Sequence, residues 1–330
     1  MNIQQIPAHT SDVDKFDYKH PIKSSFISRH KDGVILQFDY SALEMRIMGA
    51  YTKDEHMLQA FLDGEDFHKS TASIVYGKPI SEVTSEERQA TKAVNFGIAY
   101  GQSSSTLANN LGISKEEGEE IFNKYYATKP KVKDSIDYVH NFVQENGYVE
   151  TMSGHRRFLA DAQSMDKRKR SEALRQSYNT VIQGSGSYLT NMALTYIDDY
   201  IQGRNMKSDI VATVHDSIVL DCPPEEVSII YKVVKTIMEN LPFDFLKVEY
   251  KGENIQYPIA SDAEIGFNYN DAVEYDEEEV KEFNSFKGYI NYYLSLQKLK
   301  DYFESKKINE EQYKEAIRQV EEQKHLYQEM

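Results

Sequence analysis

Residues 34–44 read Val34-Ile-Leu-Gln-Phe38-Asp39-Tyr40-Ser41-Ala42-Leu43-Glu44, and the rest of the fold can be built around them. Residues 34–38 form a short apolar run that predicts a buried strand, and we expect a helix to begin at Ser41. Asp39 therefore lies at the end of a strand, where its carboxylate could hold a metal ion. The competing interpretation is a plain strand-to-helix turn, in which Ser41 and Glu44 form a capping box at S-x-x-E spacing.

A second acidic residue lies at the turn of a predicted hairpin. Residues 210–214 and 218–220 read as two strands, with His215-Asp216-Ser217 between them. If this hairpin lies beside the strand that ends at Asp39, the two carboxylates can bind a pair of divalent ions roughly 3.5–4 Å apart. Mg²⁺ favours a few carboxylates together with substrate phosphates over a cage of protein ligands. Because His and Asp are also common turn residues, a hairpin without a metal site is the alternative.

A third pattern places Arg88, Lys92, Phe96 and Tyr100 at every fourth position. At about 100° per residue, these side chains spread over about 120° of one helical face. Two cations followed by two aromatic rings suit a nucleoside triphosphate, with the cations at its phosphates and the rings at its sugar and base. The alternative is an amphipathic helix with buried rings and outward charges.

The composition of the 330 residues excludes several classes of protein. Apolar residues make up 40% and charged residues 28%, as in an ordinary globular protein, and the formal charge is −15. The acidic balance argues against a protein that coats nucleic acid generally, but an enzyme needs only a local basic groove. A single cysteine, Cys222, fits a reducing compartment, and no apolar run approaches membrane-spanning length, so we expect a cytoplasmic location. The sequence also contains no G-x-x-x-x-G-K-[ST] loop, no H-E-x-x-H and no cysteine–histidine cluster.

Taken in chain order, the three patterns resemble motifs A, B and C of the family A (Pol I-like) DNA polymerases, with the Arg88–Tyr100 face as motif B and the Asp216 hairpin as motif C. The resemblance runs from Asn2 to about Tyr275. The further similar segments are Asn2-Ile-Gln-Gln-Ile-Pro7 (N-L-Q-N-I-P in the family), Asp66-Phe-His68-Lys-Ser-Thr-Ala72 (D-I-H-x-x-T-A), Thr151-Met-Ser-Gly-His-Arg-Arg157 (T-x-x-G-R-R-R) and Arg175-Gln-Ser-Tyr-Asn179-Thr-Val-Ile-Gln183-Gly184 (R-x-x-x-N-x-x-x-Q-G).

The resemblance implies an α+β fold. An antiparallel palm sheet flanked by helices would carry the metals, and a mostly α-helical fingers subdomain would bind the nucleotide. The expected division is palm at 1–62, fingers at 63–170 with the motif B helix at 86–101, palm again at 171–275, and a helical C-terminal extension at 276–330.

The C-terminal extension lies beyond the resemblance. It contains 13 acidic and 9 basic residues, and Asn309 with Gln312 resembles a capping box that opens its second helix. We expect a helical hairpin with a solvated, mixed-charge face. A dedicated partner site is the alternative for that face.

The implied activity is template-directed DNA synthesis in DNA replication, in which a nucleotidyl group passes from a dNTP to a primer 3′-hydroxyl. Two Mg²⁺ ions would be held by Asp39, Asp216 and the backbone carbonyl of Tyr40. One ion would lower the pKa of the 3′-hydroxyl, and the other would stabilise the leaving pyrophosphate. The implied catalytic residues are Asp39, Asp216 and Lys92, and Lys92 would protonate the leaving group.

The resemblance also implies a set of nucleotide-binding residues, namely Glu44, His68, Arg88, Lys92, Phe96 and Tyr100. The cations and His68 would contact the triphosphate, and Phe96 would pack against the deoxyribose. Tyr100 would occupy the template insertion site before the fingers close. Glu44 would act as the steric gate that excludes a ribose 2′-hydroxyl.

The implied DNA-binding residues lie near the primer terminus and the minor groove, and they are Asn2, Gln4, Arg175, Asn179, Gln183 and His215. Arg156, Arg157 and the basic residues 167–170 could add positive potential for the phosphate backbone. A solvated loop is the alternative for residues 167–170.

Motif C departs from the family pattern, because it reads His215-Asp216-Ser217 where these DNA polymerases usually have H-D-E. H-D-S occurs in the related single-subunit phage RNA polymerases, so an RNA polymerase is the first alternative. Glu44 and Phe96 favour dNTPs, since the RNA enzymes lack this Glu and this Phe. A non-catalytic polymerase fragment is the second alternative.

In this family an exonuclease-type domain and a thumb precede the palm, and the sequence contains no counterpart of them. We therefore expect a separate upstream polypeptide to supply them, as in a phage-type split or interrupted polymerase. The expected partners are primer-template DNA, dNTPs and this polypeptide, in the cytoplasm of a bacterial host.

Overall fold

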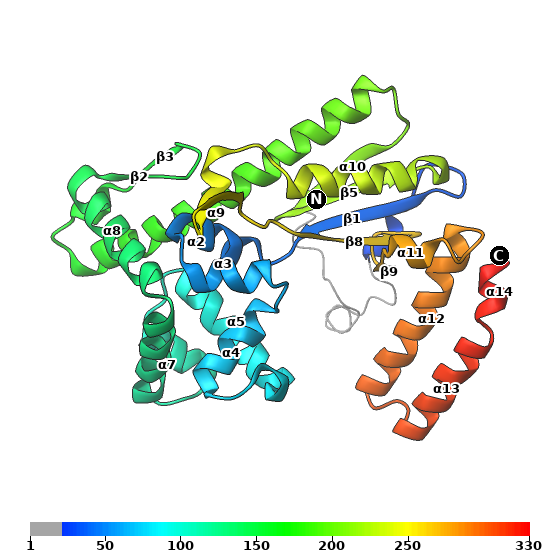
Figure 1. Cartoon of the computed structure of the whole chain (residues 1–330), viewed down its shortest axis with the longest axis horizontal. Coiled ribbons are helices and arrows are strands. Elements are labelled where there is room, and N and C mark those ends of the chain that lie inside the picture. The colour runs from blue at the N-terminus through cyan, green and yellow to red at the C-terminus, as the bar shows by residue number, and fades with distance from the viewer. Residues whose placement is uncertain (1–21) are drawn as a thin grey trace. The chain divides into compact units, whose positions relative to one another are not determined.

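The structure is a computed structural model that describes residues 22–330, so the predicted DNA-binding residues Asn2 and Gln4 lie outside the described residues (Figure 1). The chain forms two compact units. The first comprises the described residues up to Tyr40 together with Met192–Glu239 and Ser261–Met330, and the second comprises Ser41–Asn191 and Asn240–Ala260. Helix α9 (Lys167–Gly203) is continuous and contributes residues to both units.

The first unit is built on a five-stranded antiparallel sheet with the order β4-β5-β1-β8-β9. Its strands are β1 (Val34–Tyr40), β4 (Asp209–Val214), β5 (Ser217–Cys222), β8 (Ser261–Gly266) and β9 (Ala272–Glu274). The strand predicted at residues 34–38 is confirmed as the central strand, paired with β5 on one side and β8 on the other. The predicted hairpin is also confirmed, and β4 and β5 pair from Val214 and Ser217 outward.

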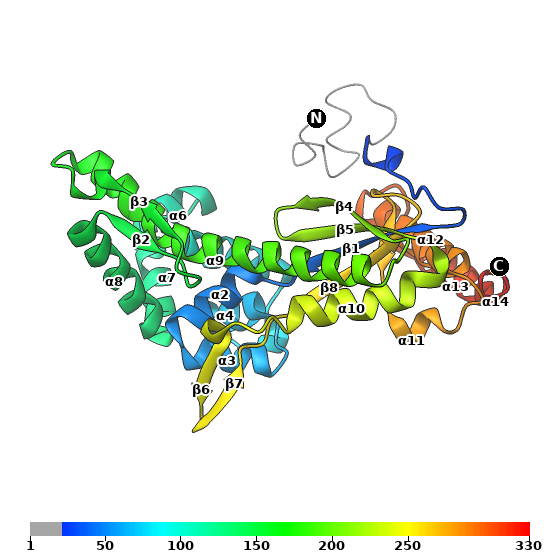
Figure 2. The ribbon, with the colours of Figure 1, turned by 90° about the horizontal axis from the view of Figure 1, so that it is seen from above.

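One face of this sheet is apolar and is covered by a helix. Along β1, Phe38 and Tyr40 are buried, whereas Asp39 is exposed. Helix α10 (Val227–Glu239) contacts β1 and β8 and runs along the sheet (Figure 2). The ring of Tyr231 on α10 stacks on Phe38 with 6.2 Å between centroids. The opposite face carries Asp39 and Gln37 of β1, together with the buried Ile35.

Four helices follow the sheet at the C-terminal end, namely α11 (Glu277–Val280), α12 (Phe286–Glu304), α13 (Glu310–Glu322) and α14 (Lys324–Gln328). Helix α12 packs against β9, and α13 packs against α12, so the predicted helical hairpin is confirmed. The predicted capping box of Asn309 and Gln312 is formed at the start of α13.

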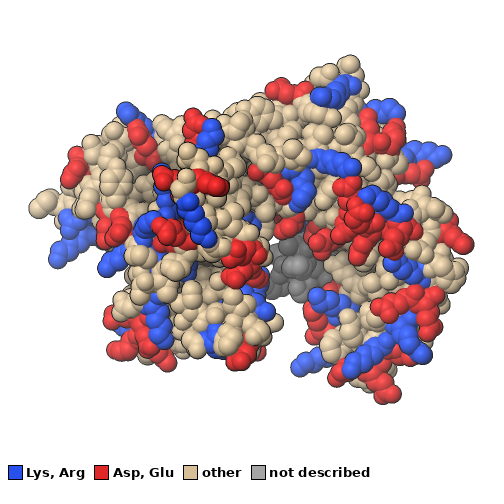
Figure 3. Space-filling model, in the orientation of Figure 1, with Lys and Arg blue, Asp and Glu red and all other residues tan. Residues whose placement is uncertain are grey.

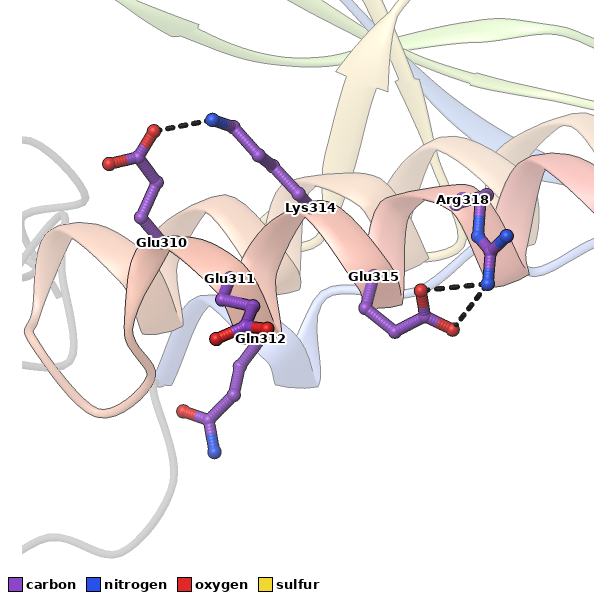
Figure 4. Close-up of a pocket in the computed structure, with 6 residues that line it drawn as sticks. All are labelled: Glu310, Glu311, Gln312, Lys314, Glu315 and Arg318. Carbon is purple, nitrogen blue, oxygen red and sulfur yellow. Dashed lines mark hydrogen bonds and ion pairs between the residues drawn. The ribbon is translucent and has the colours of Figure 1, made fainter.

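The charged surface of α13 is held by ion pairs within the helix. Glu310 pairs with Lys314 at 2.5 Å, and Glu315 pairs with Arg318 at 2.8 Å (Figure 4). Basic and acidic side chains are intermingled over the C-terminal helices (Figure 3). These observations fit the expected solvated, mixed-charge face, because exposed pairs of this kind contribute little to stability and need no partner.

The second unit is mostly helical. Its helices are α2 (Leu43–Thr52), α3 (Glu55–Leu62), α4 (Phe67–Tyr76), α5 (Ser85–Ala99), α6 (Ser104–Leu111), α7 (Lys115–Thr128) and α8 (Pro130–Asn146). Two small hairpins complete it, formed by β2 (Tyr148–Glu150) with β3 (Arg156–Phe158) and by β6 (Lys247–Tyr250) with β7 (Glu253–Gln256). Short 3₁₀ turns in the two units are η3 (Ile22–Ser25), η4 (Ile80–Glu82), η5 (Ala160–Gln163), η6 (Pro224–Glu226) and η7 (Asp244–Leu246).

The predicted fold class, α+β with an antiparallel sheet and a mostly helical part, is confirmed. Two predicted helices have other bounds in the structure, and one alternative interpretation is ruled out. Helix α2 begins at Leu43 rather than Ser41, because Ala42 has a left-handed backbone with φ +52°. Helix α5 ends at Ala99 rather than residue 101, where Gly101 has φ +67°. Residues 167–170 form the first turn of α9 and are not a loop.

The boundaries between palm and fingers stay a prediction. Within residues 22–330, none of the helices combines the length and the apolar character that crossing a bilayer requires.

Candidate active site

Asp39 and Asp216 come together in the first unit. In the antiparallel pairing of β1 with β5, Asp39 lies opposite Ser217, so Asp216 in the adjoining turn is beside it. The two carboxyl groups are within hydrogen-bonding reach of each other. The structure therefore brings the two predicted acidic metal ligands to one place, from strands that are far apart in sequence.

Two further acidic residues share this part of the sheet. Strand β8 places Asp262 opposite Asp39 and Glu264 opposite Gln37. Although Asp39 as a whole residue is exposed, its carboxyl group is partly withdrawn from water, and this partial burial first, then the charges of Asp216, Asp262 and Glu264, raise its pKa to about 7. Burial also raises the pKa of Asp216. Asp262 and Glu264 were missed in the sequence, although their alternation with Ala263 in a strand was the signal that could have revealed them.

This set of side chains fits a divalent cation. Repulsion among carboxylates raises their pKa, and a bound cation removes that repulsion. Asp39 and Asp216 are two ligands, and among the described residues no three His, Cys, Asp or Glu side chains form a metal cage. Mg²⁺ commonly takes one or two carboxylates together with substrate phosphates. The Tyr40 side chain is buried, so its predicted contribution as a ligand would come from its backbone carbonyl.

The turn that carries Asp216 is fixed by local hydrogen bonds. The Ser217 hydroxyl donates to the carbonyl of Val214 at 2.9 Å, and the Thr213 hydroxyl donates to the carbonyl of Ser217 at 3.0 Å. His215 has a left-handed backbone with φ +57° and an exposed side chain. Ser217, the departure in motif C, is thus a structural residue of the hairpin.

In the second unit, the predicted face of α5 is present. The Phe96 and Tyr100 rings stack with 5.8 Å between centroids, and the Lys92 Nζ lies 5.9 Å from the Phe96 ring centre. Both rings are half-buried rather than part of the core. Helix α5 begins at a capping box formed by Thr84 and Glu87, which fixes the N-terminal end of this face.

His68 joins this face from the neighbouring helix α4. Its ring lies 5.7 Å from the Phe96 ring, and its Nδ1 is 2.9 Å from the side-chain amide of Asn95. Burial lowers the pKa of His68 to about 4, against the opposing effect of Asp66. His68 is therefore neutral at pH 7 and can offer a phosphate a hydrogen bond but no charge. Asn95 is a partner that the sequence pattern did not reveal.

Arg88 is held by an acidic residue at the start of α4. Its Nε lies 2.5 Å from Oδ2 of Asp66, and the other carboxylate oxygen, Oδ1, accepts hydrogen bonds from the backbone amides of His68 and Lys69 at 3.0 Å. Burial alone would raise the pKa of Asp66, but the hydrogen bonds from Arg88 and from the Lys69 amide, together with the charge of Arg88, outweigh it and the pKa is lowered. Asp66 lies in a quoted family segment, yet its role as the partner of Arg88 becomes visible only in the structure.

Glu44 and Tyr100 are hydrogen-bonded partners. The Tyr100 hydroxyl donates to the Glu44 carboxylate at 3.2 Å, from α5 to α2. The alternative capping box of Ser41 and Glu44 is wrong, because Ala42 is the N-cap of α2 and no side chain caps it. Alanine rarely adopts a left-handed backbone, so the sequence pattern did not indicate Ala42 as the N-cap.

The described DNA-binding candidates occupy two places. Arg175, Asn179 and Gln183 recur every four residues on α9, and Arg175 and Gln183 are exposed. The Oδ1 of Asn179 is buried and has no hydrogen-bond partner among residues 22–330. His215 lies in the hairpin turn of the first unit. The site residues are therefore distributed over both units.

Comparisons with known proteins identify the family of this chain. The sequence profile of DNA polymerase family A matches residues 1–271. A DNA polymerase of Bacillus phage SP01 is 40% identical over 316 residues, which cover 94% of this chain and 34% of that protein. DNA polymerase I of Caldicellulosiruptor bescii is 36% identical over 239 residues, which cover 72% of this chain and 27% of that protein. The chain thus spans about a third of the phage relative and about a quarter of the bacterial one.

A solved structure is similar as well. The POL domain of Pol1 from M. smegmatis, in complex with DNA primer-template and dNTP, has a TM-score of 0.72 and 30% identity, over 82% of this chain and 45% of that chain. Because the match to the phage polymerase covers 94% of the chain, it reaches the C-terminal helices beyond the family profile, which ends at residue 271. The extent of the family profile and the identity with these polymerases show that the chain belongs to DNA polymerase family A.

Proposed function

We propose that this chain carries out template-directed DNA synthesis in replication, transferring a nucleotidyl group from a dNTP to a primer 3′-hydroxyl. The observation that supports this most strongly is the convergence of Asp39 and Asp216 at the adjoining ends of β1 and the β4–β5 hairpin. Membership of family A and the similarity to a Pol1 domain in complex with primer-template and dNTP support the same reaction.

In this proposal, Asp39, Asp216 and the Tyr40 carbonyl hold two Mg²⁺ ions. Such ions, when bound, lower the pKa of the attacking 3′-hydroxyl and stabilise the leaving pyrophosphate. The protein presents Asp216 on a hairpin turn that Ser217 and Thr213 close, so the carboxylate is positioned before substrate arrives. Its neighbours Asp262 and Glu264 add negative potential that attracts cations to this edge of the sheet.

The second unit supplies the nucleotide-binding groups. Arg88, oriented by Asp66, and Lys92 provide positive charge for the triphosphate, and Lys92 protonates the leaving group. His68 contributes a neutral hydrogen-bonding ring. Phe96 packs against the deoxyribose, and Tyr100 occupies the template insertion site until the fingers close. Glu44 excludes a ribose 2′-hydroxyl.

The proposal extends to DNA and to a partner chain. Asn2, Gln4, Arg175, Asn179, Gln183 and His215 are proposed to contact the primer terminus and the minor groove. By the resemblance to phage-type split polymerases, we also propose that a separate upstream polypeptide supplies a thumb and an exonuclease-type domain, in the cytoplasm of a bacterial host.

Primer extension tests the proposal. The chain is incubated with a short primed DNA template, Mg²⁺ and one nucleotide at a time, with and without the polypeptide encoded upstream. Incorporation of only the complementary dNTP would support template-directed synthesis, and stimulation by the upstream chain would support the partner. Incorporation of ribonucleotides at equal efficiency would favour an RNA polymerase, and the absence of incorporation under both conditions would favour a non-catalytic fragment.

A further inference from the structure

Four aromatic rings form a continuous row on the second unit. This aromatic ladder consists of Tyr138 and Phe142 on α8, Tyr148 on β2 and Phe158 on β3. Successive ring centroids are 6.1, 5.4 and 5.9 Å apart. The inner two rings are half-buried, whereas Tyr138 is 61% and Phe158 is 77% exposed.

Packing explains the inner part of the aromatic ladder but not its ends. Tyr148 and Phe158 are directly opposite in the β2–β3 hairpin, and such aromatic pairs stabilise hairpins. A terminal ring that remains largely in water gains little from that pairing. Both ends adjoin hollows of the surface: Tyr138 and Phe142 line one, and Phe158 lines another.

Cations accompany these rings. The Arg156 guanidinium lies 4.8 Å from the Tyr148 ring centre. The hollow beside Phe158 has a volume of about 800 Å³, and Arg157, Arg168 and Lys169 contribute positive charge to it. Asp161, Asp166 and Glu172 also line it. Exposed rings beside a groove with cations are the features with which proteins bind single-stranded nucleic acid, the rings stacking on bases and the cations contacting phosphates.

The same hollow is connected through α9 to the end of the motif B helix. Arg157 bonds to the side chain of Gln176 at 3.3 Å and to that of Thr180 at 2.9 Å. Arg175, which directly precedes Gln176 on α9, donates a hydrogen bond to Glu172 at 2.6 Å. Gly101, which follows Tyr100, is so close to Arg175 that a Cβ there would lie 3.2 Å from its Cγ. The hollow beside Phe158 is therefore within one helical turn of residues that contact the Tyr100–Gly101 corner.

We propose that the aromatic ladder and the hollow beside Phe158 bind the unpaired template strand ahead of the site of synthesis. This inference rests on the function proposed above, in which Tyr100 lies where the next template base enters. A strand that leads to that corner passes α9, where Arg157, Arg168 and Lys169 can meet its phosphates. The exposed faces of Phe158 and Tyr138 are free to stack on its bases, without selecting among them.

The test measures affinity for labelled DNA by fluorescence anisotropy at one fixed salt concentration. The probes are a blunt primer-template duplex, the same duplex with a ten-nucleotide 5′ template overhang, and the blunt duplex with an equally long flap on the other strand. The variants are Phe158→Ala, Tyr138→Ala and Phe158→Trp in the full chain. Tyr302→Ala is the matched control, because Tyr302 is also an exposed ring with a cation above it, that of Lys307, but belongs to α12.

The wild-type chain should bind the overhang probe more tightly than the blunt duplex. Phe158→Ala and Tyr138→Ala should each reduce this gain by roughly fivefold to a hundredfold, the range that loss of one base–ring stack produces. Phe158→Trp should retain the gain, and Tyr302→Ala should leave it unchanged. Binding of the blunt duplex should change in none of them, which also shows that the variants are folded.

Three results would overturn the inference. The first is a wild-type chain that binds the overhang probe no more tightly than the blunt duplex. The second is alanine variants that keep the full difference in affinity between these two probes. The third is variants that lose affinity for the flap probe rather than for the overhang probe. Primer extension by the same preparations separates this from the proposed function. If the chain synthesises DNA but binds the overhang probe no more tightly than the blunt duplex, only the template-binding role of the aromatic ladder is refuted. If it binds the overhang probe more tightly but synthesises no DNA, only the proposed activity is refuted.

Discussion

The Tyr100 hydroxyl donates a hydrogen bond to the Glu44 carboxylate, with 3.2 Å between the two oxygens. The bond joins the end of α5 to the first turn of α2 and holds the Tyr100 ring in its stack with Phe96. In the proposed function, Tyr100 occupies the template insertion site and Glu44 excludes the ribose 2′-hydroxyl. One hydrogen bond would therefore link the residue that reads the template position to the residue that selects the sugar.

Removal of the Glu44 side chain should weaken discrimination against ribonucleotides. We expect Glu44→Ala to lower the ratio of kcat/KM for a dNTP over the matching rNTP by roughly tenfold or more, because the side chain that blocks the ribose 2′-hydroxyl is gone and steric discrimination by a pocket is worth about 10–200-fold. Tyr100→Phe removes the same hydrogen bond but keeps the gate, and it should change the ratio by less than about threefold. Equal losses of discrimination in the two variants would contradict the gate assignment.

His68 should make the folded state sensitive to acid. Its pKa is about 4 in the folded protein and 6.5 in an unfolded chain, so the unfolded chain binds more protons between these values. The neutral His68 therefore has no effect on pH dependence above pH 6.5. As the pH falls from 6.5 towards 4, the free energy of unfolding should decrease by at most about 3 kcal/mol. Urea unfolding at pH 7 and pH 4.5 measures this loss, which should be smaller in His68→Gln. An equal loss in the variant would show that other groups cause it.

Lys129 should destabilise the protein at neutral pH. It is 2% exposed, its Nζ has no hydrogen-bond partner among the described residues, and the Tyr125 and Phe67 ring centres lie 4.5 and 5.5 Å from it. Burial lowers its pKa to about 8, against the opposing effect of Asp54. Since the unfolded chain holds this proton up to about pH 10.5, stability should rise between pH 8 and 10.5.

We therefore expect Lys129→Met to raise the free energy of unfolding by about 1–3 kcal/mol at pH 7 and by less at pH 10. The exposed Lys131, which pairs with Glu55, provides the matched control, and Lys131→Met should change stability by less than about 0.5 kcal/mol. A less stable Lys129→Met protein at pH 7 would mean that the contacts of the ammonium with the two rings outweigh its desolvation.

Ser217 should act through the hairpin rather than as a metal ligand. Ser217→Ala removes the bond to the Val214 carbonyl, which we expect to cost about 1 kcal/mol of stability and a few-fold in kcat. The apparent affinity for Mg²⁺, measured from the metal dependence of primer extension, should stay within about twofold. A tenfold weaker apparent affinity for Mg²⁺ would instead make the Ser217 side chain part of the metal site.

Local patterns in the sequence predicted the strands and the recurrent face of α5, because strand and helix periodicities are properties of neighbouring residues. The meeting of Asp39 with Asp216 was predicted from two strand ends and from the resemblance to a family, and the pairing of β1 with β5 is consistent with it. The prediction that a helix begins at Ser41 was wrong. Ala42 has a left-handed backbone, and alanine gives no indication of that conformation in a sequence pattern.

The partners that tune the site could not be predicted from sequence spacing. Asp66 with Arg88, Asn95 with His68 and Asp262 beside Asp39 depend on how separate elements pack, which spacing along the chain does not specify. Lys129 was likewise missed, since lysine is ordinarily exposed and only the structure reveals its burial.

The most direct test of the central claim compares primer extension by the wild-type chain, Asp216→Asn and Glu274→Gln, with the upstream polypeptide present. Glu274 is an exposed acid on β9 of the same sheet and is the matched control. We predict that Asp216→Asn loses at least about a thousandfold in rate, since it would remove one of the two proposed carboxylate ligands, whereas Glu274→Gln stays within a few-fold of wild type. Extension by Asp216→Asn at a rate close to that of Glu274→Gln would contradict the account.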